Sequence, residues 1–179
     1  AKNEISISKL AEKNAKQALK QKLIQSDTNN NLIDALTKKF KLKNNLELIE
    51  VYDNSHIQGY DAIGALICFG NEGFVKKRYR KFNIKNEEIK GDDYGMMKEV
   101  LFRRFSKAVK EKAGSLSLPD LILIDGGKGQ YSVSREVLNE LGLHDLPILG
   151  VSKGKKRNAG EEKIYHEGKE YILKKNDPL

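Results

Sequence analysis

LILIDGGKGQ, residues 121–130, is a run of aliphatic residues that ends on one carboxylate, Asp125, and continues into two glycines. A continuous aliphatic run of this length is typical of a strand that is buried on both faces of a parallel sheet. The glycines that follow have two interpretations: a turn with a helix cap, or a catalytic carboxylate beside backbone that a ligand can approach closely. The GGKG segment lacks the GxxxxGK[ST] spacing of a P-loop, although a phosphate-binding α/β protein that uses it stays an alternative.

The segments around this strand predict an α/β domain with a five-stranded mixed sheet flanked by helices. A long helix is expected to begin at Asp92 or Asp93, either of which can cap it, and to end at Gly114. A strand, a helix and a second strand in that order predict a right-handed crossover and therefore parallel strands. The strands are expected at residues 46–53, 61–70, 74–84, 121–125 and 147–153, with a second helix over 130–141 and a hairpin over 164–173.

The first 44 residues are expected to form a helical lead-in to a domain over residues 45–179. Apolar residues at helical spacing predict one helix over 8–24 and a second over 32–40. The polar segment SDTNNN, residues 26–31, is expected to separate the two helices.

Composition limits the class of protein. The chain has 179 residues, of which 39% are hydrophobic and 32% charged, which fits one soluble globular domain with an appendage. No apolar run approaches the roughly 18 residues that a membrane helix needs, so no membrane association is expected. The single cysteine, Cys68, excludes an internal disulfide, and no secretory pattern opens the sequence; we therefore expect a cytoplasmic protein.

Two aspartates end the two strands that are most central in this prediction. Asp53 closes the strand over 46–53, and Asp125 closes the strand over 121–125. Ligands of open α/β sheets bind outside the carboxyl ends of the strands. Two carboxylates there would repel each other unless a divalent cation stabilises both charged forms, and oxygen ligands favour Mg²⁺ or Mn²⁺. A purely structural role in turns is the competing interpretation for both residues.

Positive charge is clustered as well as abundant. Lysine and arginine exceed aspartate and glutamate by 33 to 25, which gives a net charge of +8. Clusters of this kind favour polyanions and predict sequence-independent contacts with a phosphate backbone. The clusters are FVKKRYRKF, residues 74–82, and SKGKKR, residues 152–157. The candidate DNA-binding residues are Lys76, Lys77, Arg78, Arg80, Lys128 and Lys153, and period-two alternation puts Lys76, Arg78 and Arg80 on one face of a strand.

Five motifs, in this order, closely resemble those of the C-terminal endonuclease domain of UvrC, the incision subunit of bacterial nucleotide excision repair. They are DNSHIQG (53–59), YRKFNI (79–84), DDYGMM (92–97), PDLILIDGGKGQ (119–130) and GVSKG (150–154). The resemblance covers most of the chain, including LAEKNAKQAL (10–19) in the helical lead-in.

The resemblance implies a ribonuclease H-like fold and a catalytic set similar to the Asp-Asp-His triad of Argonaute. By motif, the first aspartate falls on Asp53 and the second on Asp125. It further implies a metal-dependent DNA endonuclease that cuts on the 5′ side of a lesion. Damaged DNA is the implied substrate, and UvrB is the implied partner.

The third member of the implied triad, a histidine, has no counterpart in this sequence. The histidine of the family lies in a later motif that this chain does not contain, and Asp177 with Pro178 indicates the beginning of a helix. We therefore expect the chain to stop before that group and to be a weak or inactive nuclease alone. His56, His144 and His166 do not match the motif, and structural roles are expected for them. A non-catalytic nucleic-acid-binding or UvrB-docking domain is the alternative function.

Overall fold

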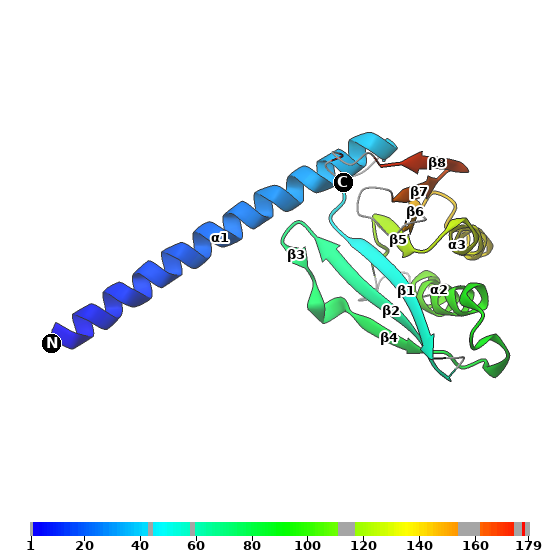
Figure 1. Cartoon of the computed structure of the whole chain (residues 1–179), viewed down its shortest axis with the longest axis horizontal. Coiled ribbons are helices and arrows are strands. Elements are labelled where there is room, and N and C mark those ends of the chain that lie inside the picture. The colour runs from blue at the N-terminus through cyan, green and yellow to red at the C-terminus, as the bar shows by residue number, and fades with distance from the viewer. Residues whose placement is uncertain are drawn as a thin grey trace.

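A mixed β-sheet lies at the centre of the protein, with two helices on one of its faces and the end of a long helix on the other (Figure 1). The computed structural model describes residues 2–42, 45–57, 60–110, 117–153, 162–173 and 177. Of residues 2–9, 57 and 60, only the backbone is described.

The sheet has eight strands among the described residues, rather than the five expected. Their order is β3-β2-β1-β5-β6-β7-β8, and β4 also pairs with β2. β1 and β5 are parallel, as are β5 and β6, which confirms the predicted parallel pairing. The strands are β1 (Ile49–Ile57), β2 (Tyr60–Gly70), β3 (Gly73–Phe74), β4 (Arg80–Asn83), β5 (Leu121–Asp125), β6 (Ile148–Ser152), β7 (Lys163–His166) and β8 (Lys169–Ile172). The number is larger because the C-terminal hairpin, β7 and β8, joins the edge of the same sheet and the expected third strand is divided.

The expected strand over residues 74–84 is interrupted by a 3₁₀ turn at Lys76–Arg78. The Arg78 backbone N–H donates to the Val75 carbonyl at 2.9 Å, which closes the turn between β3 and β4. The predicted common face for Lys76, Arg78 and Arg80 is therefore wrong, because period-two alternation does not continue across the turn.

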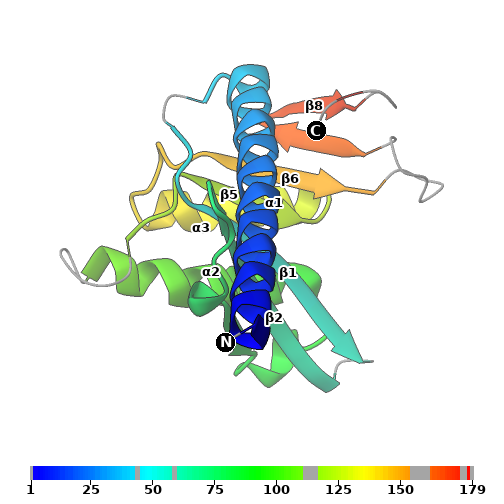
Figure 2. The same ribbon diagram turned by 90° about the vertical axis from the view of Figure 1, so that its left-hand side faces the viewer.

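A single helix, α1 (Lys2–Phe40), replaces the two helices expected in the lead-in. The polar segment 26–31 contains no glycine or proline, and the Thr28 hydroxyl donates to the Ile24 carbonyl at 2.9 Å without breaking the helix. Figure 1 shows that α1 leaves the body of the protein and that only its C-terminal part lies against the sheet. Figure 2 looks at the molecule from the side toward which α1 projects.

The other two helices cover the opposite face of the sheet. They are α2 (Asp93–Lys110) and α3 (Lys128–Glu140), and a short 3₁₀ turn at Glu87–Ile89 precedes α2. Asp92 caps α2 as expected, since its carboxylate accepts a hydrogen bond from the Tyr94 backbone N–H at 3.0 Å. The expected end of this helix at Gly114 lies outside the described residues.

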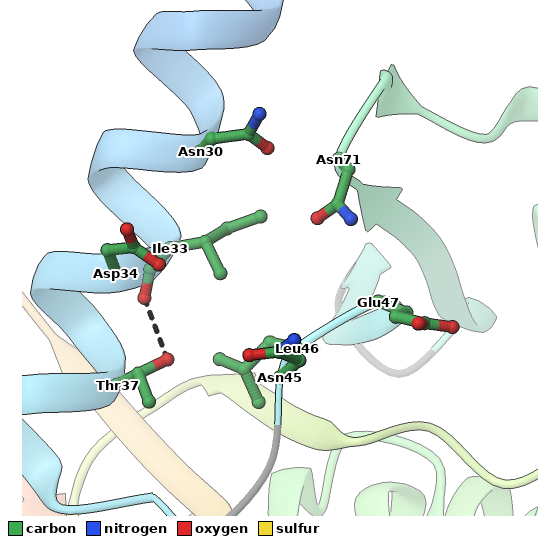
Figure 3. A pocket seen from close by; sticks show the side chains of 8 residues that line it. All are labelled: Asn30, Ile33, Asp34, Thr37, Asn45, Leu46, Glu47 and Asn71. Carbon is green, nitrogen blue, oxygen red and sulfur yellow. Dashed lines mark hydrogen bonds between the residues drawn. The ribbon is translucent and has the colours of Figure 1, made fainter.

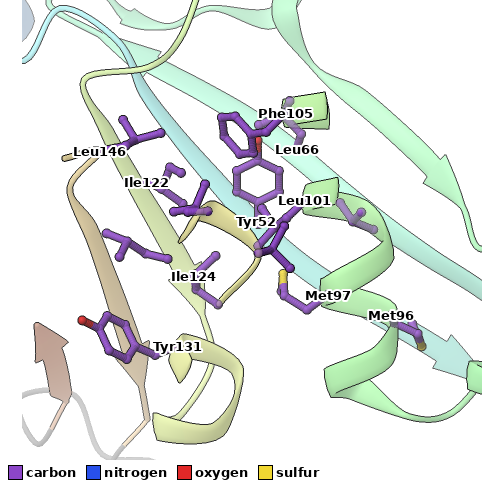
Figure 4. Packing of buried hydrophobic residues seen from close by; sticks show 14 of the residues in the cluster. Tyr52, Leu66, Met96, Met97, Leu101, Phe105, Ile122, Ile124, Tyr131 and Leu146 are labelled. Atoms are coloured by element: carbon purple, nitrogen blue, oxygen red, sulfur yellow. The ribbon is translucent and has the colours of Figure 1, made fainter. Parts of the chain in front are cut away.

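The main core lies between the sheet and these two helices, as Figure 4 shows for Tyr52, Ile122, Ile124, Met97 and Phe105. All five side chains are fully buried. α2 approaches β2 closely because position 64 is a glycine: a Cβ there would lie 2.3 Å from Val100 Cγ2. A smaller core on the other face joins the end of α1 to the sheet; its members are Ile33, Phe40, Leu46, Ile49, Leu121, Leu149, Ile164 and Leu173.

Asp120 fixes the register between β1 and β5 at their N-terminal ends. Its carboxylate accepts hydrogen bonds from the Glu47 and Leu48 backbone N–H groups, both at 2.9 Å. Its own N–H donates to the Leu48 carbonyl at 2.8 Å. From this point the strands pair in step, from Ile49 with Leu121 to Tyr52 with Ile124.

Near the C-terminus, Asp177 was expected to begin a helix, and no helix was expected to span a membrane. The Asp177 carboxylate pairs with the Lys39 ammonium, while the residues after it, in which a helix start was expected, lie outside the described residues. None of the helices in the described ranges combines the length and the apolar character needed to cross a bilayer.

We predict that Asp120→Ala lowers the free energy of unfolding by about 1–3 kcal/mol, because two backbone N–H groups lose a charged acceptor. Asp120→Asn keeps one acceptor oxygen and is expected to cost less. Urea unfolding followed by circular dichroism measures both. Equal stability of Asp120→Ala and the unmodified protein would contradict the role of Asp120 in fixing the register.

Candidate active site

Asp53 and Asp125 lie next to each other on neighbouring strands. The parallel pairing of β1 with β5 runs as far as Tyr52 and Ile124, and the two aspartates are the next residue on each strand. Because side chains alternate between the two faces of a strand, Asp53 is on the same face as Ile49, and Asp125 is on the same face as Leu121. Ile49 and Leu121 belong to the core on the α1 side of the sheet. Both carboxylates therefore project from the face opposite α2 and α3, and both residues are exposed.

The two aspartates differ in their position along the strand. Asp125 is the last residue of β5, as expected. Asp53 was expected to end its strand, but β1 continues to Ile57 and remains paired with β2. Asp53 thus lies at the point where β1 loses its β5 neighbour, which leaves one side of the strand open to a ligand.

The electrostatics of the pair indicate close approach of like charges. Partial burial raises the pKa of Asp53 above its ordinary value, and the Asp125 carboxylate raises that pKa further. Lys153 acts in the opposite direction on Asp53, and its Nζ lies 3.8 Å from Asp125 Oδ2. A lysine ammonium therefore partly neutralises the carboxylates.

A buried ion pair holds β1 in place from the other face of the sheet. Arg104 of α2 donates through Nη2 to Glu50 at 2.7 Å, and the Tyr52 hydroxyl donates to the second oxygen of Glu50 at 2.5 Å. Arg104 is 5% and Glu50 1% exposed, so the pair is shielded from water. Breaking one partner of such a pair leaves a buried charge, which makes this contact a strong constraint on the strand that carries Asp53.

The glycines after Asp125 form the turn into α3. The Gly126 N–H donates to the Val151 carbonyl at 2.8 Å, which extends the β5–β6 pairing. A Cβ at Gly126 would lie 2.9 Å from Gln130 Cβ, closer than side-chain contacts allow without a shift, so a glycine is favoured before α3. A Cβ at Gly127 would meet no atom within 4 Å, so the space beside it is open. The first glycine thus has a structural role, while the second leaves room beside the carboxylate.

The donor set fits a magnesium-type cation that keeps much of its water. Within the ranges that the structure describes, no three His, Cys, Asp or Glu side chains are grouped so as to hold a metal ion. Mg²⁺, however, is usually bound by one or two carboxylates together with waters and substrate phosphates. Two adjacent carboxylates with a shared open side meet that requirement.

The candidate DNA-binding residues are distributed over different parts of the surface. Lys153 is beside Asp125, and Lys128 is the exposed first residue of α3. Lys76 and Lys77 are exposed in the 3₁₀ turn, where Arg78 donates to the Ser117 hydroxyl at 2.9 Å. Arg80 is level with Leu66, a core residue on the α2 side, and thus lies on the face away from the aspartates. The remaining cations of SKGKKR, residues 155–157, lie outside the described residues.

The three histidines have different surroundings. His166 is buried, and its Nδ1 is 3.1 Å from the Ile148 carbonyl oxygen, which fits a structural role. His144 is exposed and contacts Asn139 at 3.3 Å. His56 Nε2 lies 3.6 Å from Asp93 Oδ1.

Asp93 adds negative charge near the aspartate pair. From the sequence, Asp92 and Asp93 could be further ligands or helix caps, and the capping role was preferred; in the structure the charge of Asp93 also raises the pKa of Asp53. The motifs DNSHIQG and DDYGMM meet through contacts of Asp93 with Asn54 and His56, which spacing in the sequence does not reveal. The acidic region therefore extends from Asp125 through Asp53 toward the beginning of α2.

A separate hollow lies between α1 and the beginning of β1 (Figure 3). Its volume is about 210 Å³, and Asn30, Asp34 and Thr37 line it on the α1 side. Asn45, Leu46 and Glu47 line the other side, just before the N-terminal end of β1. Because Asp53 lies four positions into that strand, this hollow is distinct from the aspartate pair.

Residues 37–179 match the sequence model of a family described as the UvrC RNAse H endonuclease domain. The UvrABC system protein C of Jannaschia sp. is 46% identical over 173 residues, which cover 94% of this chain and 27% of the relative. The UvrABC system protein C of Hyphomonas neptunium is 51% identical over 175 residues, which cover 94% of this chain and 28% of the relative. The chain thus spans little more than a quarter of the length of the curated relatives it matches.

Solved structures of endonucleases are more distantly similar. The crystal structure of human ENDOV matches with a TM-score of 0.39 and 18% identity, over 60% of this chain and 46% of that chain. Endonuclease V of Ciona intestinalis in complex with DNA containing an inosine matches with a TM-score of 0.40 and 15% identity, over 78% of this chain and 59% of that chain.

We predict that two substitutions shift the pKa of Asp53 in opposite directions. Asp125→Asn removes a negative charge and lowers that pKa, although burial still holds it above the ordinary value. Lys153→Ala removes a positive charge and raises it. Carboxyl carbon chemical shifts measured by NMR over a pH titration give both directions, and shifts of the same sign would contradict the arrangement.

The same raised pKa predicts an effect on stability. The folded protein binds the Asp53 proton more tightly than the unfolded chain does, so stability falls as the pH rises from the ordinary pKa to the raised one. Asp53→Asn removes this loss. We expect a higher melting temperature at neutral pH without divalent metal, measured by calorimetry, and a lower one would contradict the assigned repulsion.

Proposed function

This chain belongs to the UvrC RNase H endonuclease domain family, and from that premise we propose that it hydrolyses DNA phosphodiesters at Asp53 and Asp125 with the help of Mg²⁺ or Mn²⁺. The proposal rests on one observation: the two aspartates occupy adjacent, exposed positions on neighbouring strands and project from the same face of the sheet. Each aspartate also falls on a motif of the family.

The metal would be held by Asp53 and Asp125, with substrate phosphate oxygens and water as its other ligands. A divalent ion so held supplies Lewis-acid stabilisation of charge on the phosphate and lowers the pKa of a water molecule. The raised pKa of Asp53 fits this assignment: burial is its main cause, repulsion by Asp125 is the second, and a bound cation would stabilise the charged carboxylates against both.

The protein's own groups would position the scissile phosphate. Lys153 lies beside Asp125 and can turn from the carboxylate to a phosphate oxygen when the carboxylates are otherwise neutralised. Lys128 begins α3, where positive charge and the open space beside Gly127 favour close approach of a phosphodiester. Lys76, Lys77 and Arg78 would hold more distant phosphates of the duplex, whereas Arg80 projects from the opposite face and is left out of this path.

The finer assignments rest on family membership. We propose that residues 45–179 form the catalytic unit, that it cuts on the 5′ side of a lesion, and that UvrB on damaged DNA is the partner. Because two carboxylates supply few of the ligands of Mg²⁺, we expect metal binding by the chain alone to be weak, to strengthen with DNA, and to support slow hydrolysis at most.

We predict that Asp53→Asn and Asp125→Asn each abolish Mn²⁺ binding, measured by isothermal titration calorimetry on this chain with DNA present. Placed in a full-length relative, each is also expected to lower incision by a factor of at least about 10², because loss of a group that only supports a metal ligand already costs about 10–100-fold. Asp145→Asn, an exposed loop carboxylate, is the control and is expected to change neither. If both variants bind Mn²⁺ and incise normally, the aspartates are structural, and a non-catalytic DNA-binding or UvrB-docking domain is favoured.

A further inference from the structure

One row of residues crosses the sheet at the level of the aspartate pair. Asp53 pairs with Ala65 on β2, and Ala65 pairs with Lys81 on β4. Residues paired directly across strands project from the same face, so Lys81 lies on the face that carries the two aspartates. Its neighbour in sequence, Arg80, projects from the other face. The basic cluster of residues 74–82 therefore contributes Lys81, which sequence reasoning did not select, to the aspartate face.

The surface between Asp53 and Lys81 is uncovered. Ala65 is exposed and has a small side chain, and Ile63 and Ile67, which alternate with it, are only half-buried. Helices α2 and α3 cover the opposite face, while α1 packs near Ile164 and Leu173 and also contacts β3, away from Ala65. A ligand bound at the aspartates can therefore extend across β2 toward β4 without displacing any described element.

Lys81 borders an open groove of about 560 Å³ at the edge of the sheet. Asn83, also exposed and on the aspartate face, lines it together with Asp61 and Ile63. Lys90 lines it as well, but its ammonium pairs with Glu87 at 2.6 Å. Lys81 makes no hydrogen bond or ion pair with another described residue, so its charge is available to an anion.

The spacing fits a polynucleotide strand. Two strand spacings of about 4.8 Å put the Cα atoms of Asp53 and Lys81 about 10 Å apart. A stacked nucleic-acid strand rises about 3.4 Å per nucleotide, so this separation corresponds to about three nucleotides. A single phosphate cannot reach both positions, whereas one continuous strand can.

We propose that Lys81 holds a backbone phosphate of the DNA strand whose scissile phosphate lies over Asp53 and Asp125, with the attached nucleoside in the groove beside Asn83. The strand then runs across the sheet, roughly perpendicular to β1, β2 and β4. This inference rests on the proposed function for the scissile phosphate, but the contact at Lys81 is a binding contact that needs neither metal nor hydrolysis.

The test is the salt dependence of DNA binding by this chain, measured by fluorescence anisotropy with a labelled single-stranded oligonucleotide in EDTA. Lys81→Ala is expected to weaken binding and to reduce the slope of log K against log salt concentration by about 0.7, the value for one phosphate contact on a single strand. Asn83→Ala is expected to weaken binding without changing the slope. Lys110→Ala, an exposed lysine at the end of α2, is the matched control and is expected to change neither. An unchanged slope for Lys81→Ala, or an equal change for Lys110→Ala, overturns the proposal.

Asp53→Asn separates this result from a failure of the proposed function. In EDTA that variant is expected to bind the oligonucleotide as tightly as the unmodified chain or more tightly, since it removes a negative charge from the path of the strand. If Lys81→Ala changes the slope while the aspartate variants incise normally, the strand contact stands and the nuclease assignment fails. If the slope is unchanged while the aspartate variants lose incision, the nuclease assignment stands and the path over Lys81 is wrong.

Discussion

The register of β1 against β5 is the constraint on which the rest of the structure depends. Asp120 fixes this register at one end of the strands by accepting hydrogen bonds from two backbone N–H groups that precede β1. The aspartate pair lies at the other end of the paired segment. A slip of one residue would turn Asp53 toward the α2 side and expose Tyr52, which is 0% accessible. The hydrophobic pattern of the two strands thus keeps Asp53 and Asp125 together although their charges repel.

The unequal covering of the two faces makes that pair accessible. Helices α2 and α3 bury one face completely enough to hold the Arg104–Glu50 ion pair away from water, and this pair anchors the strand that carries Asp53. The other face is covered only where the end of α1 packs, and the remainder of α1 projects from the body (Figure 1). The packing that holds β1 in place is therefore on the α2–α3 side of the sheet, whereas the side that carries the two aspartates remains largely exposed.

The parts that sequence predicted best are those in which one pattern decides alone. The aliphatic run before Asp125 and the apolar spacing of α2 each favour a single structure, and the crossover between them fixes the parallel pairing. Three features of the structure differ from what the local sequence pattern predicts. Residues 26–31 remain helical because nothing in them breaks a helix, β1 extends beyond Asp53 because β2 continues to pair with it, and the 3₁₀ turn at 76–78 divides a strand whose alternation seemed regular. The aspartate pair was predicted from two strand ends, of which only Asp125 is one in the structure, and the face on which each cation lies required the register.

The arrangement of charge explains how a polyanion can approach a site whose centre is negative. Asp53 and Asp125 by themselves repel a phosphate, and Asp93 adds to that field. Lys153 lies beside Asp125, and Lys81 lies in the same cross-strand row as Asp53. The two lysines are therefore on opposite sides of the aspartate pair and on the same face of the sheet. Exposed charges more than a Debye length apart, about 8 Å at physiological ionic strength, are largely screened, so each lysine acts mainly on the phosphate nearest to it. In the proposed function, cations at the ends of the row and carboxylates at its middle would let the flanking phosphates of DNA bind to the lysines while one phosphate lies at the aspartate pair with a divalent cation.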